Sequence, residues 1–154
     1  MAEFTYPEAQ DVVYRQPALL NNTTCGCNKG YIAHENGFGN VTVKGVVNNP
    51  YARYARYEVK FSCNIALAEG ATVGPIAVGL TFDGEPVVDT LAIATPAAVG
   101  DFWHVSGFKT FSVMNGCCPS IAVENLSSAT GNPTITISNL NVAVNRNAEG
   151  RRVS

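Results

Sequence analysis

Charged side chains are scarce in this chain of 154 residues. Lys, Arg, Asp and Glu make up 14% of it and hydrophobic residues 46%, so the chain has enough apolar surface to fold and is not disordered as a whole. The net charge of −2 excludes a broad basic surface of the kind that binds nucleic acid. The basic cluster of Arg146, Arg151 and Arg152 is interpreted as a solubilising C-terminal end.

Long hydrophobic runs are also missing. No stretch approaches the ~18 apolar residues that span a membrane. The opening residues 1–10 contain acidic residues in place of the apolar core of a signal peptide. We therefore expect no membrane partner and no secretion signal: the protein is made and kept in the cytosol, or leaves it by assembly or lysis.

Side chains in catalytic arrangements are absent as well. His34 and His104 are the only histidines, and their spacing provides no base and orienting group for a cysteine nucleophile. The acidic residues fall at predicted turns and strand ends, without the spacing of a calcium-binding loop. We expect a protein that is not an enzyme and has no cofactor. Trp103 and Tyr51 are the aromatic residues to test for glycan binding.

Helical periodicity is missing too, and strand periodicity takes its place. In residues 57–68 alternate side chains from Tyr57 to Leu67 share one apolar face. Eight or nine short strands separated by turn residues predict a single all-β jelly-roll domain over residues 11–146. The predicted strands lie within residues 11–20, 30–34, 40–47, 57–68, 74–88, 102–113, 120–125 and 134–145.

Three local signals refine this prediction. Asp83-Gly84 predicts a hairpin turn, after which Val87 and Val88 begin the return strand. Gly107 predicts a kink in a long strand. The alternation of residues 134–145 slips by one residue near Ser138-Asn139, which predicts a β-bulge.

Two segments outside these strands are predicted to differ from the domain. Residues 1–10 carry Phe4, Tyr6 and Pro7 without alternation, so we interpret them as an extended arm that docks on a neighbour, or alternatively as a disordered start. Residues 147–154 are interpreted as a tail. On the strand over residues 75–80, Ile76, Val78 and Leu80 face the core. The opposite face, which carries small residues, is interpreted either as a subunit contact or as a surface covered by a second layer of the same domain.

The cysteines leave three readings open. Cys25 and Cys27 lie in one predicted loop, and Cys117 and Cys118 are adjacent between Gly116 and Pro119. These four thiols could bind zinc, although neither pair has the CxxC spacing of a zinc knuckle. They could also form a disulfide between the two segments or remain reduced. Cys63 is predicted to lie in the core.

Several segments carry a family resemblance. The run "YEVKFSCNIALAEGATVGPIAVGLTFDGEPVVDTLAIATP", then "FWHVSGFKTFSVMNGCCPSIAVENLS" and the closing "ITISNLNVAVNR" resemble C1q/TNF-like jelly rolls of bacteria and phages. More narrowly, "AEFTYPEAQ", "CNKGYIAH" and "NGCCPSIAVEN" resemble small proteins from the structural-gene regions of Firmicutes phages and prophages.

The resemblance implies a function of assembly. C1q/TNF-like proteins are typically homotrimers, and the phage proteins resemble capsid-decoration components on the virion surface. It implies a phage structural protein whose partner is the major capsid protein or another virion protein. The alternative is a glycan- or receptor-binding module on a spore, cell or tail-fibre surface. The resemblance supplies no catalytic residues.

Overall fold

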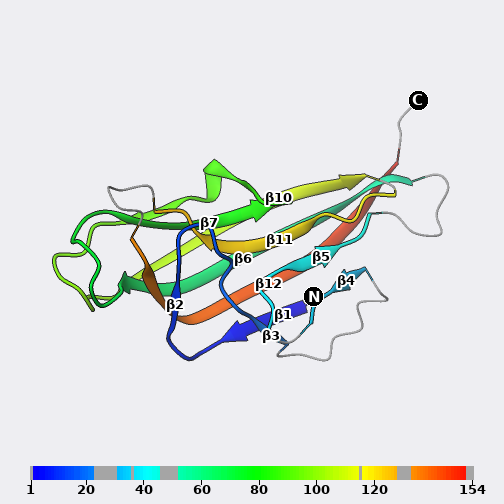
Figure 1. Cartoon of the computed structure of the whole chain (residues 1–154). Coiled ribbons are helices and arrows are strands. Elements are labelled where there is room, and N and C mark those ends of the chain that lie inside the picture. The colour runs from blue at the N-terminus through cyan, green and yellow to red at the C-terminus, as the bar shows by residue number, and fades with distance from the viewer. Residues whose placement is uncertain are drawn as a thin grey trace.

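The computed structural model describes residues 2–22, 31–35, 37–45, 52–114, 116–127 and 133–151, and these form two packed β-sheets (Figure 1). Sheet 1 has the order β10-β6-β12-β1-β3, with β2 also pairing with β12. Its strands are β10 (Trp103–Met114), β6 (Ala52–Leu67), β12 (Ile135–Arg151), β1 (Ala2–Tyr6), β3 (Asn21–Asn22) and β2 (Gln10–Val12).

Sheet 2 has the order β4-β5-β11-β7-β8, with β9 also pairing with β7. Its strands are β4 (Ile32–Ala33), β5 (Val41–Val43), β11 (Ser120–Asn125), β7 (Ile76–Phe82), β8 (Glu85–Pro86) and β9 (Ala92–Ala94). Among the described residues the helical structure is one 3-10 turn, η1 (Val88–Thr90), and no helix is long and apolar enough to cross a membrane. The predicted all-β sandwich is confirmed.

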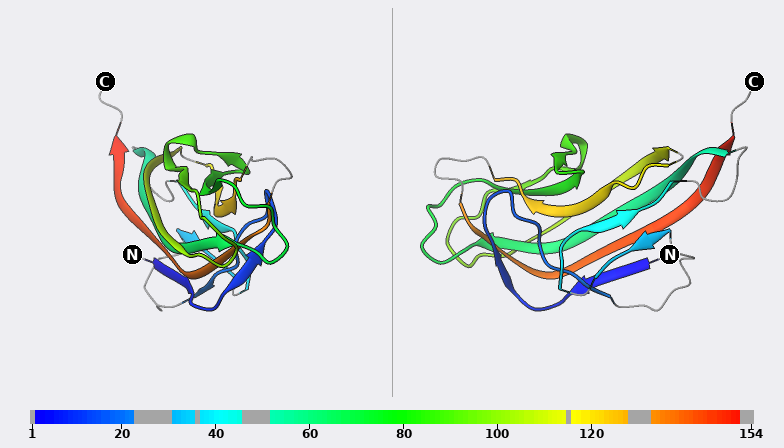
Figure 2. Two further views of the ribbon diagram at one scale, coloured as in Figure 1. Left: turned by 90° about the vertical axis from the view of Figure 1, so that its left-hand side faces the viewer. Right: turned by 45° about the vertical axis from the view of Figure 1, so that its right-hand side comes forward.

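The core fills the space between the two sheets, which are seen as two layers in Figure 2. Strand β6 contributes the alternate side chains predicted from the sequence, and Tyr57, Phe61 and Ile65 are among its fully buried residues. β12 contributes Ile135, Ile137 and Leu140 to the same core. The period of two residues therefore predicts which face of each long strand is buried.

The predicted bulge and hairpin turn are both confirmed. Ser138 pairs with Asn64 and Asn141 with Ser62, so β12 has one extra residue relative to β6, and Asn139 adopts a φ of 50°. At the hairpin Phe82 pairs with Glu85, and Asp83 and Gly84 both have positive φ. The return strand is shorter than predicted, because it ends at Pro86 and Val88 begins η1.

The predicted N-terminal arm is corrected over residues 2–6. These residues form β1, which pairs antiparallel with β12 and places Phe4 opposite Val142. Ala2 and Phe4 are buried in the core, Tyr6 packs against it, and Pro7 is exposed. The alternation of Ala2, Phe4 and Tyr6 is too short to identify a strand by its period alone.

The predicted tail is corrected in the same way, because β12 extends to Arg151. Backbone pairing with β6 continues past the predicted boundary, with Ala148 opposite Arg56 and Arg151 opposite Ala52. The domain therefore includes residues 2–6 and 147–151, which lie outside the predicted bounds 11–146.

The outer face of β7 is covered by the same chain. A Cβ placed on Gly79 would lie 3.0 Å from Leu126 Cδ1 and 3.5 Å from both Leu91 Cα and Thr90 Oγ1. Ala77 on the same face is buried. At Ala77 and Gly79 the second layer of the same domain is therefore the correct reading, whereas Pro75, which the prediction placed on the same face, is exposed.

Gly107 is required for packing, and β10 continues through it as one strand. A Cβ at Gly107 would lie 2.3 Å and 2.8 Å from two ring carbons of Phe61 and 3.0 Å from the carbonyl oxygen of Thr90. The missing side chain allows the Phe61 ring to lie against β10.

We predict that Gly107→Ala lowers the free energy of unfolding by about 1–3 kcal/mol, because the methyl group overpacks the Phe61 ring. Chemical denaturation followed by circular dichroism measures this change. Gly74→Ala is the matched control, since a Cβ there meets no atom within 4 Å. Equal stability of the two variants would contradict the packing role of Gly107.

Candidate functional site

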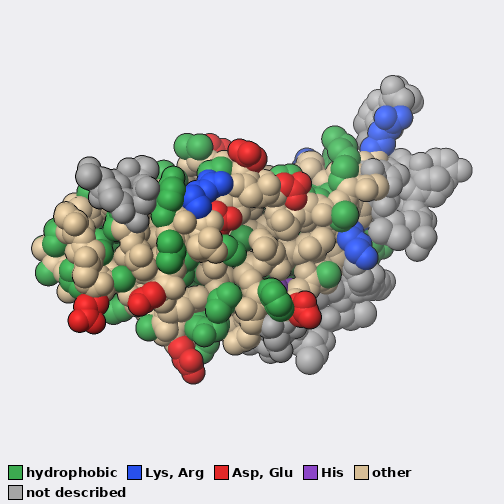
Figure 3. All heavy atoms as spheres, in the orientation of Figure 1, with side chains coloured by type: hydrophobic (Ala, Val, Ile, Leu, Met, Phe, Trp, Pro, Cys, Tyr) green, Lys and Arg blue, Asp and Glu red, His purple; other side chains and the backbone are tan. Residues whose placement is uncertain are grey.

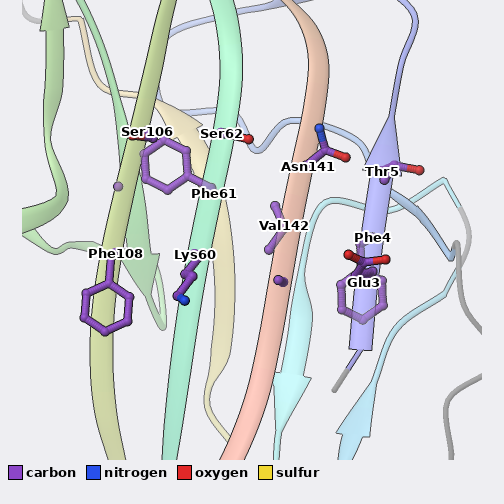
Figure 4. A pocket seen from close by; sticks show the side chains of 12 residues that line it. Glu3, Phe4, Thr5, Lys60, Phe61, Ser62, Ser106, Phe108, Asn141 and Val142 are labelled. Carbon is purple, nitrogen blue, oxygen red and sulfur yellow. The ribbon is translucent and has the colours of Figure 1, made fainter.

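The outer face of sheet 1 carries the candidate site. On this face β10, β6, β12 and β1 present the side chains that alternate with their core residues. The pairing register aligns them in rows: Phe108, Lys60, Ala143 and Glu3 form one, and Ser106, Ser62, Asn141 and Thr5 form the next. We call these eight residues the open face. They line a shallow hollow of about 550 Å³ (Figure 4).

The open face is mostly uncharged and partly exposed. Most of its side chains are short and uncharged, and Lys60, Ser106, Phe108 and Asn141 are solvent-exposed. Phe108 is 50% exposed, and the Lys60 ammonium nitrogen lies 5.6 Å from the centroid of its ring, within range of a cation–π interaction. Of these residue types the aromatic ring is the one enriched in protein interfaces, whereas serine, alanine, lysine and glutamate are depleted there.

Charge is sparse elsewhere too. Figure 3 shows charged side chains that are few and mostly separate on the face in view. One pair of opposite charges is Lys109 and Asp89, whose nitrogen and oxygen lie 2.5 Å apart at the β10–η1 contact. This ion pair lowers the pKa of the exposed Asp89 carboxyl group, through its hydrogen bond from Lys109 and then through Lys109's charge.

The predicted arm residues lie away from the open face or beneath it. The Phe4 ring packs against the His34 ring at a centroid distance of 4.7 Å, on the core side of β1. Figure 4 shows Phe4 and Val142 among the residues around the hollow, where they form its floor. Phe4 is therefore not available as an anchor for a partner, whereas Tyr6 is partly exposed.

Two of the four cysteines in the predicted thiol cluster lie among the described residues. Cys117 and Cys118 are free, solvent-exposed cysteines in the turn between β10 and β11, and both line a second hollow. Cys25 and Cys27 lie outside the described residues, so a disulfide or zinc site shared by the two segments stays a prediction. Cys63 is buried in the core, where burial raises the pKa of its thiol to about 12.

The remaining candidates are spread over the molecule. His34 Nε2 lies 2.7 Å from the carbonyl oxygen of Phe38, and His104 Nδ1 lies 3.2 Å from the side-chain oxygen of Asn64. Asp83 accepts a hydrogen bond from the Ser120 backbone at the hairpin turn. Trp103 is 48% exposed at the end of β10, and Tyr51 lies outside the described residues. The described residues contain no group of three His, Cys, Asp or Glu side chains that could hold a metal ion.

The open face was missed by the sequence analysis. Alternation in residues 57–68 and 102–113 assigns Lys60, Ser62 and Phe108 to the face opposite the core. A sequence pattern does not tell which outer faces are covered by the rest of the chain. The signal that could have identified this face is Phe108, an aromatic residue at an outward position beside serines.

Comparison of the structure with solved structures shows a C1q/TNF-like fold. The globular domain of zebrafish complement 1qA protein aligns over 92% of both chains, with a TM-score of 0.53 and 13% sequence identity. Eiger TNF from S. frugiperda aligns over 99% of this chain and 95% of its own, with a TM-score of 0.59 and 12% identity.

Comparisons of the sequence add nothing to this result. No family model matches the chain, and no curated protein matches it. The predicted C1q/TNF-like jelly roll is therefore confirmed as a fold by structural similarity.

We predict that a maleimide reagent modifies Cys117 and Cys118 in the native protein at neutral pH, whereas Cys63 reacts only after denaturation. The raised pKa keeps the Cys63 thiol protonated, and burial excludes the reagent. Peptide mass mapping of native and denatured samples measures the three sites separately. Modification of Cys63 in the native protein as fast as that of Cys117 would contradict the buried position.

Proposed function

We propose that this chain is a non-enzymatic structural module that assembles as a homotrimer through the open face of sheet 1. The observation that carries the proposal is the difference between the two sheets. Residues 90–91 and 126 cover the outer face of β7 in sheet 2, whereas Phe108, Lys60 and Asn141 in sheet 1 are exposed. A broad sheet face with an exposed aromatic ring is suited to burial against a partner.

A second copy of the same chain is the partner that fits this surface best. The open face carries one acidic residue, Glu3, and one basic residue, Lys60, so it presents no single-sign charge that would repel an identical chain. Its short side chains permit close approach of another surface. The C1q/TNF-like fold and the sequence resemblance support three copies as the assembly.

The sequence resemblance further supports a place on the outer surface of a phage or phage-like particle, with the major capsid protein or another virion protein as partner. In that role the trimer is a capsid-decoration protein, made in the bacterial host cytoplasm and added during assembly. Because Phe4 belongs to the core, Pro7, which is exposed, and Tyr6, which is partly exposed, are the predicted arm residues available to contact the particle.

The second candidate function is a glycan- or receptor-binding module. The observation that favours it is the neighbouring pair Phe102 and Trp103, each 48% exposed. Exposed aromatic rings stack on sugar rings and anchor interfaces. Specific glycan binding that Trp103→Ala abolishes would favour this function over the particle role.

We predict that the wild-type chain has the mass of three copies by light scattering at micromolar concentration and that Phe108→Glu shifts it to a single copy. The substitution would place an unpaired carboxylate in the contact between copies. Phe38→Glu is the matched control, because Phe38 is exposed to a similar extent, 58% against 50%, in the loop between β4 and β5. A monomeric wild-type chain would refute the trimer, and a trimeric Phe108→Glu variant would refute this face as its interface.

We predict that antibodies raised against the chain label the outside of purified particles from a host that carries its gene. Immunogold electron microscopy measures the labelling, with particles from a deletion strain as the control. Absence of the chain from purified particles would refute the particle role but would not bear on the proposed trimer.

A further inference from the structure

The turn between β10 and β11 brings three sulfur-bearing side chains to one hollow. Met114 ends β10, and Cys117 and Cys118 lie in the turn before β11 begins at Ser120. All three line a hollow of about 440 Å³, together with Phe82, Asp83 and Pro119. Cys117 and Cys118 are both exposed and free, and Met114 is 56% exposed.

Backbone hydrogen bonds hold this turn in place. The Cys117 amide donates to the Met114 carbonyl oxygen at 3.0 Å. A hydrogen bond between residues three apart is typical of a β-turn, and it holds Met114 close to Cys117. Gly116 within the turn has a φ of 84°, a conformation that favours glycine. The Gly45 amide donates to the Cys117 carbonyl oxygen at 2.9 Å, and the Val43 amide donates to the Pro119 carbonyl oxygen at 3.0 Å. Segment 43–45 therefore holds the backbone at Cys117 and Pro119, the residues on either side of Cys118.

The two thiols are poorly placed to oxidise to a disulfide with each other. Adjacent Cα atoms across a trans peptide are about 3.8 Å apart, below the ~4.4 Å at which ordinary disulfides begin. Cys63 is buried in the core of β6 and cannot reach them without unfolding. The turn therefore presents an exposed dithiol beside a thioether.

We propose that this hollow binds monovalent copper through the thiolates of Cys117 and Cys118 and the thioether of Met114. Thiolate and thioether sulfur are soft ligands that select Cu(I), whereas a structural zinc site uses four nitrogen, sulfur or carboxylate ligands. Asp83 also lines the hollow, but its carboxylate accepts a hydrogen bond from the Ser120 amide, and the described residues contain no group of three His, Cys, Asp or Glu side chains that could hold a metal ion. Phe82, Val113 and Pro119 supply apolar walls on one side of the hollow, and the three ligands remain open to solvent on the other.

Binding leaves the oxidation state of the metal unchanged. Cu(I) enters as the ion, each cysteine thiol that ligates it loses its proton to solvent, and Met114 ligates as the neutral thioether. Because protons are released, the apparent affinity rises with pH. The site lies in the β10–β11 turn, so the proposal is independent of the assembly through the open face.

The test uses the reduced full-length chain under anaerobic conditions, titrated into the coloured Cu(I) complex of bathocuproine disulfonate. We expect the chain to withdraw one Cu(I), Cys117→Ser/Cys118→Ser to abolish this transfer, and Met114→Leu to weaken it roughly tenfold or more. Met114→Leu keeps the size of the side chain and removes the sulfur. Copper X-ray absorption of the loaded wild type should show sulfur neighbours only.

Two controls make the outcome decisive. Cys25→Ser/Cys27→Ser leaves the three proposed ligands intact and should retain the transfer, and circular dichroism checks that each variant is folded. Wild-type transfer by the Cys117→Ser/Cys118→Ser variant would overturn the site. Loss of transfer in Cys25→Ser/Cys27→Ser, or an unchanged affinity in Met114→Leu, would overturn the three-sulfur ligand set.

Discussion

The pairing of β6 with β12 is the constraint on which the rest of the structure depends. These strands of 16 and 17 residues lie side by side in sheet 1, with β10 on the far side of β6 and β1 and β2 on the far side of β12. Their shared register decides which side chains enter the core, because a slip of one residue would turn every side chain to the opposite face. The bulge at Asn139 absorbs the one extra residue of β12, and so Ile137 and Leu140 both remain buried although they are three residues apart.

A buried side-chain amide at the end of β11 links sheet 2 to the strands of sheet 1. Asn125 is fully buried, and its side-chain nitrogen donates to the carbonyl oxygens of Val12 and Pro133 at 2.8 and 2.9 Å. Its side-chain oxygen accepts from the Ser127 amide at 3.0 Å. A buried amide is tolerated when its hydrogen bonds are made, and here they join β2, the start of β12 and the segment after β11. That segment contains Leu126, which covers the outer face of β7, so one polar residue connects the two sheets and the cover of sheet 2.

Local patterns in the sequence were sufficient to predict the long strands, and longer-range packing decided the rest. Alternation predicts the buried face of β6, the slip at Ser138-Asn139 predicts the bulge, and Asp83-Gly84 predicts a hairpin turn; all three depend on residues close in sequence. The packing role of Gly107 was not predicted, because it depends on the ring of Phe61, 46 residues earlier. The packing of Leu126 over Gly79 and the exposure of the open face around Phe108 were missed for the same reason, because both depend on residues far apart in sequence. Which outer face stays exposed depends on the packing of the whole chain, so the periodicity of one strand cannot predict it.

The position of β1 changes what an N-terminal deletion can reveal. If residues 1–10 were a free arm, their removal would test docking without disturbing the fold. Instead Phe4 lies in the core against His34 and β1 pairs along β12 from Val144 to Leu140, so the deletion removes a strand and an aromatic core side chain together. Loss of one buried phenylalanine side chain alone costs about 3–5 kcal/mol, a large part of the stability of a small domain. Because β1 also supplies Glu3 and Thr5 to the open face, a truncated chain that failed to assemble would have lost core, sheet and interface at once. Single substitutions at exposed residues, with Phe38 as the reference for Phe108, separate assembly from folding where truncation does not.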